Sequence, residues 1–477
     1  MQFNSYLFIL LFLPLTLLAY FGLNRMKKYN AAKLSLVVAS LIFYGYNEIT
    51  YVFVILSSIL VNYLGCVMLR RFTWCRKIIV VVGVIANIAL LGYFKYFDFL
   101  LENINALTGS EFSYLNLALP LGISFFTFQQ LSYLIDAGRG KYASHSFLDY
   151  ILFVTFFPQL VAGPIVSHDE MLPQFASREN KKMDAANFSM GIQAFSIGLF
   201  KKVMVADNFG KIVTYGYGHI HALNSLEAVL TILAYTIQIY FDFSGYCDMA
   251  TGIGLMFNIK LPVNFDSPYK ARTIVEFWKR WHKTLTRFLT NYVYIPLGGN
   301  RKGSVRTYIN ILLVFFVSGI WHGAGWTFIL WGLLHGIANV LCRLCARTIE
   351  KIPGWINWTV NFLFLNLTWT IFRAESVGQV WKLLRRVTSG GFSINAELTE
   401  TLLQPTMISL PAQFIPFLWV ILGFTAVTLL VSVFAPNTNE IISRRRIGVW
   451  SLLWSYVLFI ASMLSLSGVS TFLYFNF

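Results

Sequence analysis

Long apolar runs recur along the whole chain and limit what it can fold into. A helix of about 20 apolar residues is long enough to cross the hydrocarbon layer of a bilayer. The candidate spans are 6–23, 34–46, 49–69, 78–97, 115–137, 187–206, 226–243, 307–321, 326–342, 355–372, 413–434 and 447–466. Charged residues make up 12% of the chain, which is about half of their usual share in soluble proteins. The sequence therefore predicts an all-α polytopic membrane protein.

The net charge of +16 is concentrated in short basic clusters between the apolar runs. These clusters lie at 24–33, 70–77, 138–141, 343–351 and 444–446. Such clusters mark cytoplasmic loops, where Lys and Arg also meet anionic lipid headgroups. The pattern predicts that both termini lie outside and that 377–387 is an external amphipathic helix. It favours membrane lipid and argues against nucleic acid as a partner.

Two regions are too broken or too polar to be simple spans. The segment 147–166 is apolar but carries Pro158, Gly163 and Pro164. Proline and glycine interrupt helices and leave backbone polar groups without hydrogen-bond partners. Lipid cannot satisfy these groups, so such a segment must be buried in protein or line a cavity. We expect a re-entrant element there. The second region, 242–306, gathers acidic, amide and basic side chains in an otherwise apolar chain, and function is to be sought in it.

One amphipathic helix is expected inside this polar region. Its apolar side would carry Phe277, Trp278, Trp281, His282, Leu285, Phe288 and Leu289, and its basic side Lys279, Arg280, Lys283 and Arg287. A basic amphipathic helix lies at a membrane interface. It either anchors the chain to headgroups or also binds an anionic cytosolic substrate, since Arg and Lys side chains hold phosphates.

His322 is an ionisable residue inside a long apolar stretch. Polar groups within the bilayer are costly and usually functional. Glycines at 319, 323 and 325 flank it, so backbone or ligand can approach closely. Dry surroundings favour the neutral imidazole, which can accept a proton. The alternative is a core histidine that is hydrogen-bonded across helices, and we expect that structural role for His335.

The sequence carries no Gly-rich phosphate-binding loop, no motif of a serine-histidine-aspartate catalytic triad and no His-Glu-x-x-His zinc motif. Its five cysteines indicate no disulfide framework. We predict no metal and no tightly bound cofactor. The chemistry would then rest on histidine and on a substrate that is already activated, such as a thioester.

A series of strings along the chain is more specific than any single histidine. The strings are FDFSGYCDMATGIGLMFNIKLPVNFDSPY (241–269), EFWKRWHKTL (276–285), NYVYIPLGGNRKG (291–303), SGIWHGAGWTFILWGLLHG (318–336), FFPQLVAGPI (156–165) and STFLYFNF (470–477). Together they resemble the signature of the bacterial membrane-bound O-acyltransferase (MBOAT) family. The resemblance covers essentially the whole chain and is strongest to the alginate O-acetylation branch.

The resemblance implies a single MBOAT membrane domain over residues 1–477. The signature core would occupy about 150–345, and C-terminal helices with an external aromatic tail would occupy 355–477. The family fold implies roughly 11–13 membrane helices around a central tunnel, with re-entrant elements, in the inner membrane of a bacterium. We expect the tail to fold back towards the outer opening. Its alternating aromatic residues are Phe472, Tyr474, Phe475 and Phe477.

The resemblance also implies an activity. An acetyl group would pass from cytosolic acetyl-CoA, across the membrane, to an extracytoplasmic SGNH-type acetyltransferase partner like AlgJ or AlgX. From there it would reach hydroxyls of an alginate-like exopolysaccharide. His322 matches the catalytic histidine of the family, and His282 its second signature histidine. Substrate-binding side chains are predicted within the same signature: Asp242, Trp278, Arg280, Trp281, Asn291, Tyr294 and Trp321.

Two alternatives remain open at this point. One is D-alanyl transfer to teichoic acid from a carrier-protein thioester, which uses the same type of acyl chemistry. The other belongs to a different class, a polysaccharide transporter or flippase. Such a transporter needs internal inverted repeats with paired broken helices, and the two halves of the sequence show no such similarity.

Overall fold

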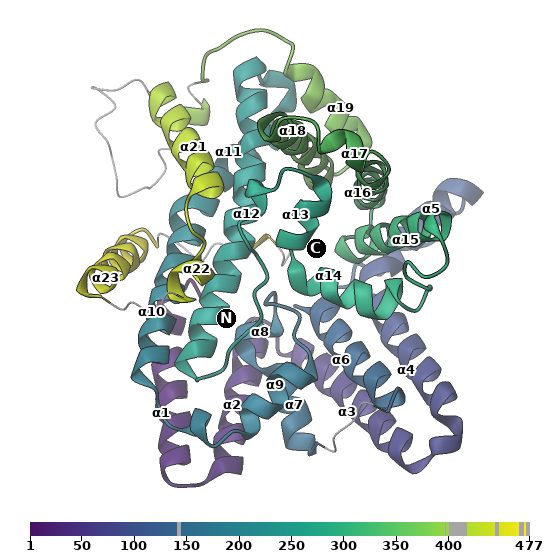
Figure 1. Cartoon of the computed structure of the whole chain (residues 1–477), viewed down its shortest axis with the longest axis vertical. Coiled ribbons are helices and arrows are strands. Elements are labelled where there is room, and N and C mark those ends of the chain that lie inside the picture. Colours follow the sequence, from purple (N-terminus) through teal and green to yellow (C-terminus); the bar gives the residue numbers. More distant parts are fainter. Residues whose placement is uncertain (141–144, 396, 400–416, 444–447, 467–471, 474–477) are drawn as a thin grey trace. The chain divides into compact units, whose positions relative to one another are not determined.

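The computed structural model of the chain describes residues 1–140, 145–395, 397–399, 417–443, 448–466 and 472–473, and these are mainly helical (Figure 1). Among them, the helical segments long and apolar enough to cross a membrane are Phe8–Arg25, Thr50–Arg71, Thr73–Thr108, Ser225–Met256, Gly303–His322 and Trp326–Leu344. Shorter apolar helices are Tyr29–Gly45, Trp419–Phe434 and Val449–Leu464. The predicted all-α polytopic membrane class is confirmed.

Backbone contacts divide the chain into two compact units, which we describe separately. Among the described residues, unit 1 comprises Met1–Phe195 and Met249–Pro262, and unit 2 comprises Ser196–Asp248 and the described part of Val263–Leu473. The boundary crosses helices α10 (Ala185–Phe200) and α12 (Ser225–Met256). A single domain over residues 1–477 stays a prediction.

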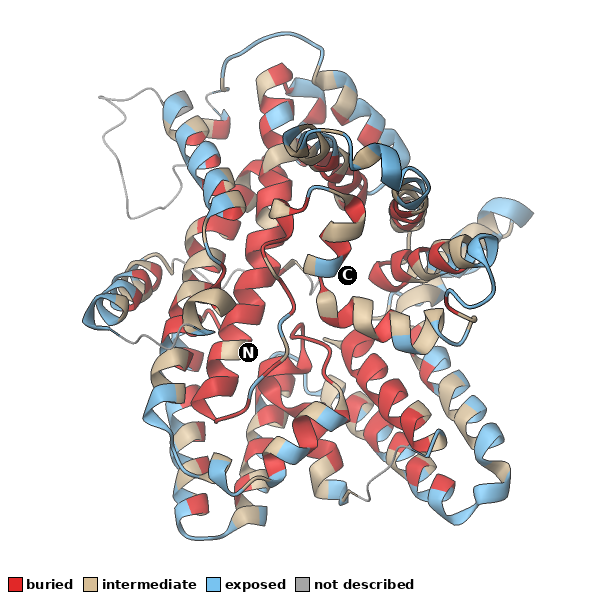
Figure 2. Cartoon of the chain, viewed as in Figure 1, coloured by how far each residue is buried: buried red, intermediate tan, exposed pale blue. Residues whose placement is uncertain are grey.

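Unit 1 is built around α6, which packs against α3 and α4, while α2 packs against α1 and α7. Almost every residue of α6 is buried (Figure 2). The helices are η1 (Phe8–Phe12), α1 (Leu13–Arg25), α2 (Tyr29–Gly45), α3 (Thr50–Arg71), α4 (Arg76–Leu91), η3 (Gly92–Tyr96), α5 (Phe97–Thr108), α6 (Ile123–Gly138), α7 (Phe147–Thr155), α8 (Phe157–Leu160) and α9 (His168–Ala176).

The broken apolar segment 147–166 lies in unit 1 and is buried in protein, as its prolines and glycine require. Its helix stops at Thr155, a short helix α8 follows, and residues 150–166 are all buried. At Gly163 a Cβ atom would lie 2.4 Å from Gln159 Cα, so the tight turn after α8 excludes a side chain. Whether this element enters the membrane from the cytosolic side stays a prediction.

Unit 2 has the paired helices α15 and α16 at its centre, with α13 and α18 packed against α16. Its helices, beside the parts of α10 and α12 that it contains, are η5 (Lys201–Ala206), α11 (Asp207–Gly218), α13 (Ile274–Arg280), α14 (Lys283–Leu289), η8 (Thr290–Tyr294), α15 (Ser304–His322), α16 (Trp326–Leu344), α17 (Ala346–Ile349), α18 (Gly354–Arg373), α19 (Val377–Arg386), α21 (Phe417–Phe434), α22 (Thr438–Ser443) and α23 (Val449–Leu464).

Long apolar helices differ widely in how much protein covers them. In α12, 72% of the most apolar stretch is buried, against 11% in the helical segment Thr73–Thr108. Figure 2 shows α12 buried along most of its length and α4 largely exposed. In a membrane, exposed apolar side chains face lipid, and a covered helix is where polar side chains can be satisfied by protein partners. The polar side chains of α12 are therefore candidates for internal contacts.

Several helix boundaries differ from the predicted spans. The span expected at 115–137 begins only at Ile123, because Pro120 precedes it and Gly122 has a φ of +69°. The span expected at 226–243 continues to Met256. Helical structure also extends the expected span 78–97 to Thr108 through the π-helical turn η3. The amphipathic helix expected at 377–387 is present as α19.

The contact between α15 and α16 depends on glycines on both helices. A Cβ atom at Gly332 would lie 2.4 Å from Phe315 O, and one at Gly319 would lie 2.5 Å from Phe328 O. These neighbours are backbone atoms, which cannot rotate away. Small residues let membrane helices approach closely and gain packing contacts.

Gly332→Ala should therefore lower the free energy of unfolding by about 1–3 kcal/mol, because the added methyl group forces the two backbones apart. The matched control is Gly423→Ala in α21, where a Cβ atom meets nothing within 4 Å. Alanine favours helix by up to about 1 kcal/mol over glycine, so this variant should be as stable as wild type or more so. Thermal unfolding in detergent measures both. Equal effects of the two substitutions would contradict the proposed contact.

Candidate active site

His282 lies at a break between two short helices, α13 and α14. The single amphipathic helix predicted through Phe277–Leu289 is wrong at this point, because the backbone of His282 is left-handed, with φ 45° and ψ 50°. Residues other than glycine rarely adopt this conformation, which costs on the order of 1 kcal/mol or more. It is maintained only where surrounding contacts determine it.

Asn264 supplies those contacts. Its backbone oxygen accepts a hydrogen bond from Lys283 N at 3.0 Å. Its side-chain Oδ1 accepts from Thr284 N at 3.3 Å and from Thr284 Oγ1 at 2.8 Å. The same Oδ1 is 3.1 Å from His282 Nδ1. Asn264 thus ties the first turn of α14 to the loop before α13. It lies in the polar region 242–306, but the sequence does not predict it as a site residue.

The imidazole of His282 is fully buried among aromatic rings. The Phe243 ring meets it edge-on at a centroid distance of 4.9 Å, and the Trp321 ring lies at 6.0 Å. His282 has no exposed surface. Burial lowers the pKa of His282 to about 3, because the charged form loses its hydration. The ring is therefore neutral near pH 7.

His322 is the last residue of α15, directly before the turn into α16. The rings of Trp321, Trp331 and Phe372 lie around it at centroid distances of 4.9, 5.0 and 5.3 Å. At Gly323, which follows it, a Cβ atom would lie 2.2 Å from the Phe328 ring. A side chain at this position would therefore displace the Phe328 ring.

The two histidines, which are far apart in sequence, come together in unit 2. Their ring centroids lie 6.4 Å apart with an interplanar angle of 59°. His322 is 3% exposed and His282 0%. We call His282 and His322 the histidine pair. Of the predicted binding residues, Trp321 contacts both members of it.

Trp278 and Trp281 belong to neighbouring aromatic contacts. Trp278 Nε1 donates to His335 Nδ1 at 3.2 Å, and His335 Nε2 lies 3.1 Å from Thr368 Oγ1. This bridge between α13, α16 and α18 is the structural role expected of His335. Trp281 packs on Trp369 at a centroid distance of 4.9 Å. Both tryptophans are buried, so they line the interior near the break.

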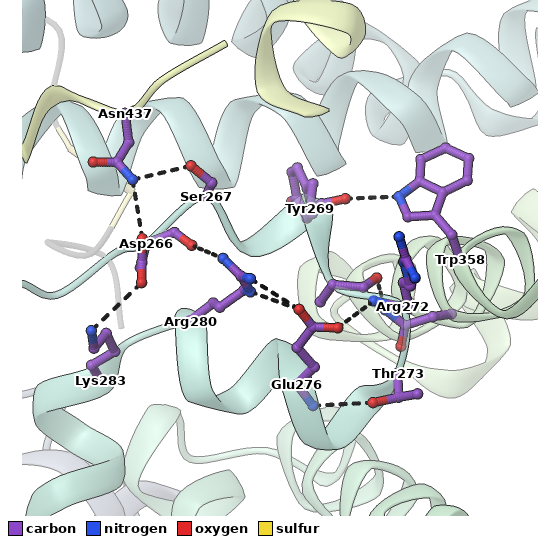
Figure 3. A network of polar contacts seen from close by, with 12 residues as sticks. Asp266, Ser267, Tyr269, Arg272, Thr273, Glu276, Arg280, Lys283, Trp358 and Asn437 are labelled. Atoms are coloured by element: carbon purple, nitrogen blue, oxygen red, sulfur yellow. Dashed lines mark hydrogen bonds and ion pairs between the residues drawn. The ribbon is translucent and has the colours of Figure 1, made fainter. Parts of the chain in front are cut away.

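Arg280 is held by the chain itself. Its Nε donates to Glu276 Oε1 at 3.0 Å, and its Nη1 donates to Asp266 O at 3.1 Å (Figure 3). Glu276 Oε2 in turn accepts from Arg272 N. Asn437 donates to Asp266 Oδ1 in the same network. A role of Arg280 in holding substrate stays a prediction.

Asp242 is also engaged internally. Its Oδ1 accepts from Lys202 Nζ at 2.7 Å, and its Oδ2 accepts from Leu473 N at 3.0 Å. Lys202 also pairs with Asp207 at 2.9 Å, and its ammonium lies 4.5 Å from the centre of the Phe472 ring. The side chains of Lys202 and Asp242 are each 2% exposed. Phe472 of the predicted tail therefore folds back onto α12, whereas Tyr474, Phe475 and Phe477 lie outside the described residues.

Asn291 and Tyr294 lie in the π-helical turn η8 that follows α14. Asn291 is exposed and Tyr294 is half-buried. Both residues are therefore more exposed than the histidine pair, which is buried. Their predicted substrate contacts stay predictions. Within the described part of the chain, His, Cys, Asp and Glu side chains form no group of three that could hold a metal ion.

The fold and the buried histidine pair define a polytopic membrane protein with a site suited to acid–base chemistry. The sequence model of the membrane-bound O-acyltransferase (MBOAT) family matches residues 2–381 of this chain. The chain therefore belongs to the MBOAT family. It is an acyltransferase that acts on hydroxyl acceptors, which overturns the transporter alternative.

Individual relatives refine this assignment. The chain is 46% identical over 415 residues to the peptidoglycan O-acetyltransferase of Helicobacter pylori, covering 80% of this chain and 79% of that protein. It is 36% identical over 402 residues to the probable alginate O-acetylase AlgI of Pseudomonas aeruginosa, covering 82% and 75%. It is 27% identical over 250 residues to the teichoic acid D-alanyltransferase of Streptococcus thermophilus, covering 49% and 59%.

Lys202→Met should lower the free energy of unfolding by about 3–5 kcal/mol, because it leaves the buried carboxylate of Asp242 without its cation. The matched control is Lys283→Met. Lys283 lies 3.8 Å from Asp266, and both side chains are more than a third exposed, so its loss should cost at most about 1 kcal/mol. Thermal unfolding of the two purified variants compares them. A Lys202→Met variant as stable as the control would show that the ion cluster does not stabilise unit 2.

Proposed function

We propose that the chain transfers an acetyl group from cytosolic acetyl-CoA to a hydroxyl of an extracytoplasmic acceptor or partner protein, with the histidine pair as its catalytic centre. The observation that carries the proposal is the 6.4 Å approach of two buried imidazoles in a chain of an O-acyltransferase family. Buried polar groups in a membrane protein are costly, and they are usually retained for function.

In this proposal, neutral His322 takes the proton from the acceptor hydroxyl as its oxygen attacks the thioester carbonyl. The carbon–oxygen bond forms and the carbon–sulfur bond breaks, and the proton held by His322 goes to the leaving thiolate. A general base of this kind contributes typically about 10²–10⁴-fold to the rate. The reaction needs no metal, because the thioester is already activated.

The donor would enter from the cytosol, where the basic clusters of the sequence are predicted to lie. Acetyl-CoA is an anionic thioester, and Lys and Arg side chains bind phosphate groups. We place the protein in the inner membrane of a bacterium, since its relatives are bacterial proteins. An SGNH-type acetyltransferase outside the membrane, like AlgJ or AlgX, would receive the acetyl group.

Peptidoglycan is the first candidate for the final acceptor. Identity to the peptidoglycan O-acetyltransferase is 46%, against 36% to the probable alginate O-acetylase AlgI of Pseudomonas aeruginosa, over similar lengths of this chain. An alginate-like exopolysaccharide is therefore the second candidate. D-alanyl transfer is favoured less, because that relative matches only 49% of this chain.

His322→Ala should abolish O-acetylation in a strain that depends on this chain, because no base remains to take the hydroxyl proton. His282→Ala should lower it strongly as well. The measurement is base-labile acetate released from purified peptidoglycan and, separately, from exopolysaccharide. The polymer that loses its acetate in a strain without this protein is the acceptor.

The control is His335→Gln, because glutamine can both accept from Trp278 and donate to Thr368. This variant should lower thermal stability but retain transfer per folded molecule. Wild-type levels of acetate with His322→Ala, at matched protein abundance, would refute the catalytic assignment. Incorporation of D-alanine instead of acetate would show that the alternative acyl group is used.

A further inference from the structure

The contact between His282 and Asn264 determines which nitrogen of the imidazole carries its proton. Asn264 is 2% exposed and His282 is 0% exposed, so their partners come from the protein. Asn264 Oδ1 lies 3.3 Å from Thr284 N and 3.1 Å from His282 Nδ1. A backbone N–H can only donate, so the atom that faces Thr284 N must be the amide oxygen and not the amide nitrogen.

The same oxygen then constrains the histidine. An amide oxygen only accepts hydrogen bonds, so Nδ1 of His282 must be the donor in their contact. A neutral imidazole carries one proton, which leaves the lone pair on Nε2. The amide nitrogen of Asn264 donates to Cys247 Sγ at 3.4 Å. The orientation of Asn264 rests on Thr284 N, because the thiol of Cys247 can donate as well as accept.

Aromatic neighbours hold the plane of this ring. Phe243 meets His282 at an interplanar angle of 87°, and the Phe265 ring lies 6.4 Å away at 32°. The backbone hydrogen bond from Lys283 N to Asn264 O, at 3.0 Å, anchors the other end of the contact. Rotation of the imidazole would therefore lose both its hydrogen bond to Asn264 and its packing against these rings.

We propose that Asn264 is a positioning residue that locks His282 in its Nδ1–H tautomer, so that Nε2 acts as a hydrogen-bond acceptor in the histidine pair. This inference rests on the proposed function. It makes His282 a hydrogen-bond acceptor at Nε2 and not a hydrogen-bond donor. Nε2 accepts a hydrogen bond from the acceptor hydroxyl. It does not donate to the developing negative charge of the thioester carbonyl.

The acceptor role excludes one function for His282, which is to stabilise negative charge at the thioester carbonyl. A side chain that stabilises an oxyanion must be a hydrogen-bond donor. With its only proton committed to Asn264, a neutral His282 cannot serve in that way. An acceptor at this position instead orients the hydroxyl that His322 deprotonates.

The tautomer is measured directly on the intact protein in detergent or nanodiscs. Selective ¹⁵N labelling of histidine distinguishes the protonated ring nitrogen from the bare one, and comparison with His282→Gln assigns the signals. Wild type should show Nδ1–H for His282. Asn264→Ala should shift His282 towards the Nε2–H tautomer, whereas Asn264→Asp should retain Nδ1–H, because a carboxylate also accepts. A wild-type protein with Nε2–H at His282 would overturn the inference whatever the activity.

Acetyl transfer is measured for the same variants at matched thermal stability. Asn264→Ala should lose on the order of 10- to 100-fold in transfer rate, the equivalent of one buried hydrogen bond to the reacting group. Asn264→Asp should recover most of that loss. The matched control is Asn361→Ala in α18. Asn361 is a buried asparagine that donates to Ala271 O at 3.0 Å, so the control should lose stability without a change in tautomer or in transfer per folded molecule.

The outcomes separate this inference from the function on which it rests. Full transfer by Asn264→Ala, together with inactive His322→Ala, would overturn the positioning role and leave the acyltransferase centre in place. Full transfer by His322→Ala as well would overturn the centre itself. A rate loss in Asn361→Ala equal to that in Asn264→Ala would show that buried asparagines act here only through stability, and would also overturn the positioning role.

Discussion

Buried polar groups in this protein must find their partners within the protein, because neither lipid nor an apolar core can replace water. The break before α14 follows from this requirement. His282 adopts a strained backbone conformation, and Asn264 supplies the acceptor that its Nδ1 and the first turn of α14 need. The same rule pairs His335 with Trp278, and Lys202 with Asp242. Each contact connects segments that are distant in sequence and so specifies one arrangement of the helices.

Close helix packing provides the second part of the site. Glycines on α15 and α16 bring the two backbones together and place His322 at the end of α15. The break at His282 then brings the other imidazole to 6.4 Å from it. A site made from a helix end and a helix break is precise, because both members are fixed by backbone geometry and not only by side-chain rotamers. Positioning of this kind is a large part of catalysis.

Charged side chains show where sequence reasoning reaches its limit. The family signature predicts Arg280 and Asp242 as substrate-binding residues. In the structure, Arg280 is bound to Glu276, and Asp242 to Lys202 and to Leu473 N. Sequence spacing can suggest the Arg280–Glu276 pair, which lies one helical turn apart. It cannot suggest the pairing of Asp242 with Leu473, because only the fold brings the chain end to α12.

Sequence by itself determined the class of the protein, because long apolar runs with few charges have no stable fold in water, and the signature strings identify the family and both histidines. It also indicated that the broken segment 147–166 must be buried in protein or line a cavity. Only the tertiary structure decided that the helix expected through His282 is broken, that Asn264 is its partner, and that Arg280 and Asp242 are engaged by the chain itself. The physical reason is that helix periodicity is a local property. The left-handed residue, the tautomer and the ion pairs depend on partners supplied by other segments of the chain.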